Sequence, residues 1–102
     1  MPALHEAAKA GDLTQCQSLI NSGIDVNVRD NFQRTPLHLA AEKGYKAVCR
    51  FLVATGADVH AQADEQETPL HSAALYGFEE VCQILVEQGA DVHAQYETQQ
   101  TP

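Results

Sequence analysis

The sequence predicts an all-α fold, a solenoid of stacked helix-turn-helix units joined by extended, hairpin-like loops. The stretch TPLHLAAEKGY at residues 35–45 returns almost unchanged as TPLHSAALYGF at residues 68–78, an interval of 33 residues. The same interval separates every glycine and every cysteine: Gly11, Gly44 and Gly77; Gly23, Gly56 and Gly89; Cys16, Cys49 and Cys82. A fixed interval of this length is typical of repeat proteins.

Start and stop signals predict the first helix of each unit. In the second unit, Thr35 is a favourable N-cap, and Pro36 suits the first helical position because its missing N–H costs no hydrogen bond there. Leu37 and Ala41 then share one face of a short helix. Gly44 can adopt the left-handed conformation that ends a helix.

A second helix is predicted to follow and to end at Gly56, with an apolar side formed by Val48, Cys49, Leu52 and Val53. The next residues, 57–67, alternate between apolar and polar and then turn, which indicates extended chain leading to a tight hairpin-like loop. Each helix is too short to be stable alone, because helix nucleation is costly. Stacking of similar units covers the apolar faces and stabilises them together.

In this period and in the motifs TPLHLAA and GADVHAQ, the chain resembles the ankyrin repeat family. The resemblance covers residues 1–102 as one ankyrin repeat domain, with units at about 2–34, 35–67 and 68–100 and then the first residues of a fourth. The family often has Gly at the loop-tip positions that hold Gln33, Gln66 and Gln99, so we expect less tightly turned tips. His60 and His93 replace the family's Asn, which is kept as Asn27.

The first unit is polar at registers that are mostly apolar in the others. Glu6, Gln15 and Ser18 correspond to Leu39, Val48 and Phe51 of the second unit, so we expect the first three to face water at the N-terminal end. The third unit keeps its apolar residues, namely Val81, Ile84, Leu85 and Val86. We interpret them as an outer face built to be covered, which predicts further repeats after residue 102 or end-to-end self-association.

Packing explains the cysteines better than chemistry does. Neighbouring helices lie about 8–10 Å apart, too far for a disulfide between equivalent cysteines. No Cys-x-x-Cys or His-x-x-x-His spacing is present to bind zinc, so no metal or cofactor is expected. Each cysteine falls on the apolar side of a second helix, where the thiol acts as a small hydrophobe. Free buried thiols fit a reducing compartment, so we expect an intracellular location, cytoplasmic or nuclear.

The histidines fall into two groups. The family resemblance implies that His5, His38 and His71 hydrogen-bond loops and helix starts, and no nucleophile accompanies each copy, so the chain is not expected to be an enzyme. His60 and His93 are expected on partly exposed loops. A mild pH dependence of stacking or binding through them is a hypothesis.

The charge distribution bears on partners. The net charge of −8 argues against a nucleic-acid surface, which needs clustered Lys and Arg, and no apolar run is long enough to span a membrane. All six basic residues precede residue 51, whereas nine acids and no Lys or Arg follow residue 53. We therefore expect a protein partner that presents a basic and apolar segment to the acidic loop residues.

Recognition by a rigid concave surface is the function that this pattern favours. The family resemblance places partner contacts at loop tips and at the ends of first helices, here Asn31, Phe32, Arg34, Glu42, Lys43, Asp64, Glu65, Glu67, Leu75 and Tyr76, with Lys9, Ala10, Glu97, Thr98 and Gln100 at equivalent positions. Phe32, Leu75 and Tyr76 are either interface anchors or packing residues. In the second case Phe32 fills its own loop, and Leu75 and Tyr76 cover the following unit.

Two other function classes stay open. The chain is alternatively a regulatory or targeting segment of a larger enzyme, effector or channel of which it forms the N-terminal part. It is otherwise a structural spacer without a partner of its own.

Overall fold

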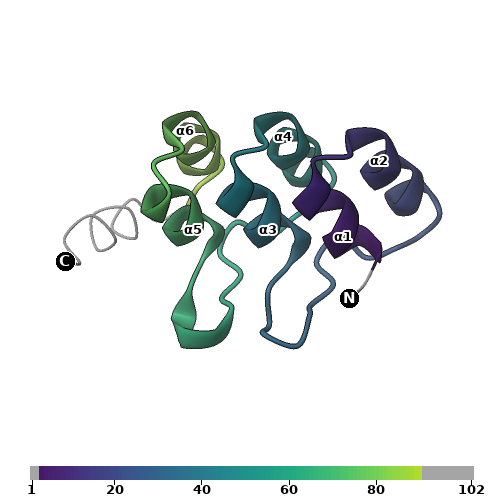
Figure 1. Cartoon of the computed structure of the whole chain (residues 1–102), viewed down its shortest axis with the longest axis horizontal. Coiled ribbons are helices and arrows are strands. Elements are labelled where there is room, and N and C mark those ends of the chain that lie inside the picture. Colours follow the sequence, from purple (N-terminus) through teal and green to yellow (C-terminus); the bar gives the residue numbers. More distant parts are fainter. Residues whose placement is uncertain (1–2, 91–102) are drawn as a thin grey trace.

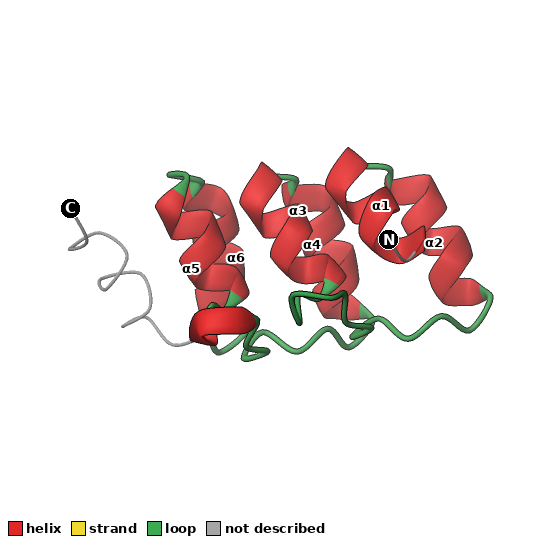
Figure 2. Ribbon diagram, turned by 60° about the horizontal axis from the view of Figure 1, so that its bottom comes forward, coloured by secondary structure: helices red, strands yellow, loops and turns green. Residues whose placement is uncertain are grey.

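The computed structural model describes residues 3–90 and contains, over that range, six α-helices, one short 3-10 turn and no strand. The elements are α1 (Ala3–Ala10), α2 (Leu13–Asn21), α3 (Pro36–Lys43), α4 (Lys46–Ala54), η1 (Asp64–Gln66), α5 (Pro69–Leu75) and α6 (Glu79–Glu87). Three helix pairs stand in a row, and the long loops project to one side (Figures 1 and 2). The predicted all-α class and stacked arrangement are confirmed.

The helices form two layers. In the first layer α3 packs against both α1 and α5, and in the second layer α4 packs against both α2 and α6. Each helix also packs against its partner in the same unit. Small residues let the first-layer helices approach closely, and larger side chains fill the space between the layers. The fully buried members include Ala8, Ala40, Ala41, Ala73, Leu37, Leu52, Leu70 and Leu85.

The first helices begin and end as the sequence predicts. Thr35 Oγ1 accepts a hydrogen bond from the backbone N–H of His38, and His38 Nδ1 accepts one from the N–H of Thr35, at 3.4 and 3.0 Å. Thr68 and His71 form the same capping box at the start of α5. Gly44 ends α3 with a φ of 75°, which a glycine adopts without strain.

The second helices α4 and α6 have aromatic residues at the N-cap position, Tyr45 and Phe78, whose side chains form no capping hydrogen bond. Each ring packs instead on the glycine that ends the first helix of the preceding unit. A Cβ added to Gly44 would lie 2.6 Å from the Phe78 ring, and one added to Gly11 would lie 2.9 Å from the Tyr45 ring. A Cβ on Gly77 would meet no atom of the described residues within 4 Å.

The polar registers of the first unit lie in water, as expected. Glu6, Gln15 and Ser18 are exposed, whereas Leu39 and Val48 at the equivalent registers of the second unit are buried. This register therefore faces the N-terminal side of each unit. In the second unit it is covered by the first.

The same geometry corrects the interpretation of the third unit. Val81, Ile84 and Leu85 are 1%, 5% and 0% exposed, so they do not form an outer face. Val81 and Ile84 line two hollows that open between α6 and the preceding α4, with volumes of about 420 and 350 Å³. Of the four residues, only Val86 is exposed. End-to-end self-association stays a prediction, without support from these residues.

The two loop tips that the structure describes are turned more tightly than the glutamines led us to expect, and Gln99 lies outside the described residues. The N–H of Asp30 donates to the carbonyl of Arg34 at 3.0 Å, and the N–H of Ala63 donates to the carbonyl of Glu67 at 2.7 Å. Gln33 and Gln66 both adopt a φ of 63°, the left-handed conformation in which glycine is the usual residue. The hydrogen bonds across the tip therefore set the backbone geometry against the preference of the side chain.

Replacing either tip glutamine with glycine should stabilise the chain. Because a non-glycine residue pays a steric penalty at positive φ, Gln33→Gly and Gln66→Gly should each raise the free energy of unfolding by roughly 0.5–1 kcal/mol. Urea denaturation followed by circular dichroism measures the change. Gln62→Gly, at a loop position without positive φ, is the matched control and should be neutral or destabilising. Equal effects at all three positions would contradict the assignment of strain to the tips.

Candidate functional site

The predicted site residues fall into two groups at opposite ends of the first-layer helices. Asn31, Phe32, Arg34, Asp64, Glu65 and Glu67 belong to two loop tips, which we name tip 1 (residues 30–34) and tip 2 (residues 63–67). Glu42, Lys43, Leu75 and Tyr76 form a helix-end edge. α3 has eight residues, so the two groups are separated along its axis by roughly 12 Å. Glu97, Thr98 and Gln100 lie outside the described residues.

Tip 1 is organised by Asp30. Its Oδ1 accepts from the N–H groups of Phe32 and Arg34 at 2.9 Å each, and its Oδ2 accepts from Arg34 Nε at 2.8 Å. Partial burial opposes ionisation of this carboxyl, but these hydrogen bonds and the guanidinium charge outweigh it and lower the pKa of Asp30. The Arg34 guanidinium lies 5.1 Å from the centre of the Phe32 ring, which is nevertheless 59% exposed. The tip therefore presents an aromatic ring on a fixed support.

Tip 2 carries three acids and has Ala63 where tip 1 has Asp30. Asp64 and Glu65 are exposed, and Glu65 adopts a φ of 63° within the η1 turn. Glu67 is half-buried and accepts a hydrogen bond from Ser72 Oγ at 3.1 Å. Within residues 3–90, none of these three carboxylates forms an ion pair. Tip 2 is thus a source of uncompensated negative charge.

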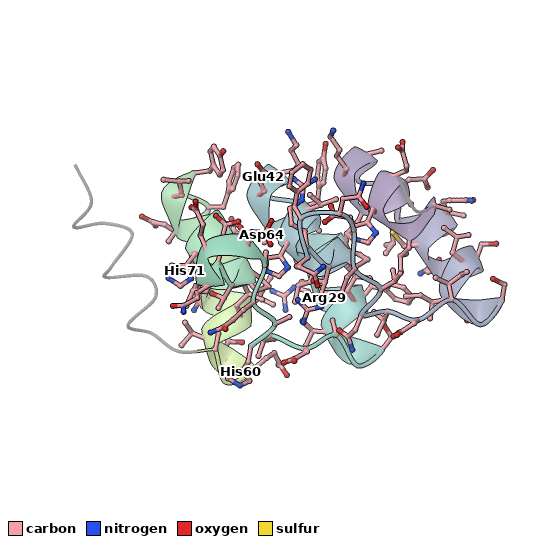
Figure 3. The ribbon with its side chains drawn as sticks, turned by 90° about the horizontal axis from the view of Figure 1, so that it is seen from below. Arg29, Glu42, His60, Asp64 and His71 are labelled. Carbon is pink, nitrogen blue, oxygen red and sulfur yellow. The ribbon has the colours of Figure 1, made fainter. Side chains whose placement is uncertain are left out.

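Two contacts join the tips. The N–H of Asp64 donates to the carbonyl of Phe32 at 3.1 Å. Arg29 Nη1 donates to the carbonyls of Gln33 and Gln62, at 2.9 and 2.6 Å. Figure 3 views the molecule from the loop side and shows Arg29 and Asp64 there. The sequence interpretation missed both Arg29 and Asp30.

A weak signal for Arg29 was present in the sequence. It stands where the other units have Gln62 and Gln95, so it departs from an otherwise repeated residue type. Asn27 makes a further connection, because its Nδ2 donates to the carbonyl of Gly56 and its Oδ1 accepts from the N–H of Asp58. The loops of the first and second units are therefore held together along their length.

The helix-end edge is polar in the second unit and apolar in the third. Lys43 is exposed and Glu42 half-buried, whereas Leu75 and Tyr76 are large apolar residues that are 58% and 54% exposed. The Tyr76 hydroxyl donates to Glu42 Oε1 at 3.4 Å, which connects α5 to α3. Leu75 and Tyr76 are therefore available for contact on the surface of residues 3–90, and the alternative that they cover a following unit stays open.

Comparison with protein families decides what this stack of helix pairs is. A family model for ankyrin repeats, in three copies, matches residues 4–96. The chain belongs to the ankyrin repeat family. Ankyrin repeats are generally protein–protein interaction modules and are typically non-catalytic. A search of curated proteins gives no match.

The histidines that recur in the ankyrin units have structural partners. His38 Nε2 donates to the carbonyl of Glu67 at 2.8 Å, and His5 Nε2 donates to the carbonyl of Arg34 at 2.6 Å. Burial lowers the pKa of His38 to about 4. His60 is exposed and its ring has no hydrogen-bond partner among the described residues, whereas His93 lies outside them. The pH hypothesis for these two histidines stays a prediction.

The thiols of the ankyrin units are free and buried, as the packing interpretation predicts. Burial raises the pKa of Cys49 to about 12, and burial is also the main cause of the raised pKa of Cys16 and of Cys82. A thiol that is protonated and shielded from solvent is a poor nucleophile. In the described part of the chain, no helix is long and apolar enough to cross a membrane.

Proposed function

We propose that this ankyrin domain is an interaction module that binds a partner protein across its concave first-helix surface, between the loop tips and the helix-end edge. The observation that carries the proposal is the exposure of three large side chains, Phe32, Leu75 and Tyr76, on these two borders. Exposed aromatic residues at fixed positions are the usual anchors of interfaces. The tip hydrogen bonds described above hold one of them in place before binding, which reduces the entropy lost on association.

The charges support a partner segment that is basic as well as apolar. Within residues 3–90, Asp64, Glu65 and Glu67 form no ion pair, while Arg34 is already paired with Asp30. A Lys or Arg of the partner would therefore meet unpaired carboxylates at tip 2, and an apolar side chain would meet the ring of Phe32. Because these acids lie at or near the surface, their contribution should fall as salt screens it.

The test begins with a pull-down from cell lysate that compares the chain with its Phe32→Ala, Leu75→Ala, Tyr76→Ala variant. For a protein recovered only by the unchanged chain, the triple variant should reduce the affinity by about tenfold or more, measured by isothermal titration calorimetry. Affinity should also fall as the NaCl concentration rises. The matched control is Ile24→Ala with Val86→Ala, which removes apolar residues exposed elsewhere and should leave affinity unchanged.

Two results would contradict parts of the proposal. An affinity unchanged in the triple variant would contradict the proposed placement of the site. An affinity independent of salt would contradict the proposed charge complementarity but not the role of the apolar anchors.

A further inference from the structure

The two loop tips are connected by a side chain that the repeat pattern does not supply. Among residues 29–34 and 62–67, all of which the structure describes, Arg29 is the one residue whose side chain hydrogen-bonds from one loop to the other. Its Nη1 donates hydrogen bonds to the carbonyl of Gln33 in tip 1 and to the carbonyl of Gln62, the residue before tip 2. Hydrogen bonds from a charged donor are shorter and roughly twice as strong as neutral ones.

The residue type matters for this link. One guanidinium nitrogen carries two N–H groups in a fixed plane, so it can donate to two carbonyls at once. The neutral Gln62 stands at the same register of the next unit, where it offers a shorter side chain and no charge. The side-chain part of the connection between the two loops therefore depends on the residue at position 29 and not on the repeat motif itself.

The link bears directly on the proposed binding surface. The backbone bond from the Asp64 N–H to the Phe32 carbonyl joins the residue that carries the anchor ring to the first acid of tip 2. Phe32 and Asp64 are both exposed, so water competes for the N–H and the carbonyl that form this bond. Arg29 adds a second connection between the same two loops, which limits how far the tips can separate.

We propose that Arg29 is a positioning residue that clamps tips 1 and 2 into one recognition surface, so that the Phe32 anchor and the tip 2 acids bind a partner cooperatively. The cooperative part rests on the proposed function, whereas the clamp itself does not. Arg29 acts through the backbone of the tips and needs no contact of its own with the partner.

The clamp is tested by amide hydrogen exchange, measured by NMR on the whole chain. In Arg29→Gln, the Asp64 N–H should exchange about tenfold faster, because its bond to Phe32 opens more often. Arg29→Lys keeps the charge but loses the planar two-carbonyl geometry and should give an intermediate rate. The matched control is Arg50→Gln on α4, which removes the same charge away from the tips and should leave this rate unchanged. An unchanged Asp64 rate in Arg29→Gln would overturn the proposal.

The cooperative part is tested with a peptide selected on the unchanged chain from a phage-displayed random library. The effects of Phe32→Ala and Glu65→Gln on affinity should be coupled when Arg29 is present. The factor by which affinity falls in the double variant should then be smaller than the product of the factors for the two single variants. In the Arg29→Gln background the losses should become multiplicative. Weaker peptide binding in Arg29→Gln with an unchanged Asp64 rate would assign Arg29 to direct contact and overturn positioning. If neither Phe32→Ala nor Glu65→Gln affects any selected peptide, the proposed function fails, and the exchange rates still decide the clamp.

Discussion

Gly44→Ala should destabilise the chain by about 2–4 kcal/mol, the largest effect we expect from adding one carbon atom. Part of this cost is steric strain, because Gly44 has a φ of 75° and a Cβ there costs roughly 1–2 kcal/mol. The rest comes from overpacking, since the new Cβ would lie 2.6 Å from the Phe78 ring and force it to move. Urea denaturation followed by circular dichroism measures the loss.

Gly77→Ala is the matched control, because Gly77 has the same φ of 75° with no described atom near the added carbon. It should cost only the strain, about 1–2 kcal/mol. Replacing Phe78 with Leu in the Gly44→Ala background should recover part of the difference, which a double-mutant cycle isolates. Equal losses at Gly44 and Gly77 would show that the aromatic contact between units contributes nothing measurable.

Acidification from pH 7 to pH 4 should remove about 3 kcal/mol of stability through His38 alone. Burial is the main cause of the lowered pKa of this imidazole, about 4 against an ordinary 6.5, and the charge of Arg29 adds to it. Between these two values the unfolded chain binds a proton that the folded chain does not. The contribution is therefore complete above pH 6.5 and is lost progressively as the pH falls toward 4.

The hydrogen bonds explain why the neutral ring is favoured. Nδ1 accepts from the N–H of Thr35 while Nε2–H donates to the carbonyl of Glu67, so a second proton on Nδ1 would break the capping box. His38→Gln should lower stability at pH 7 and flatten the pH dependence between 6.5 and 4. Denaturation midpoints of the unchanged chain and of His38→Gln across this pH range provide the comparison, and an equally steep pH dependence in the variant would exclude His38 as the cause.

The helices could be predicted from the sequence because their signals are local. Thr35, Pro36 and Gly44 each act on the backbone beside them, and the structure places the ends of α3 there. The tips differ, since Gln33 is held at positive φ by hydrogen bonds across the turn that override its own preference. Local preference therefore predicts where a helix ends better than how a tip closes.

The errors concern contacts between units. Equivalent residues repeat along the chain, but the repeat alone does not say which side of a unit faces its predecessor, so Val81 and Ile84 were assigned to the wrong face. Arg29 was missed for a related reason, because its partners are carbonyls of two different loops and no sequence motif encodes them. The exposure of Phe32, Leu75 and Tyr76 could be predicted because large apolar residues at water-facing registers are unusual within the pattern.

The regular placement of the thiols has a practical consequence. Each helix pair holds a single buried thiol, Cys16, Cys49 or Cys82, and each is kept protonated and out of reach while its own helix pair stays packed. A thiol-modifying reagent can therefore report separately on the opening of each helix pair, with the labelled peptide identifying which one opened. The chain carries its own reporters of partial unfolding, one for each helix pair that the structure describes.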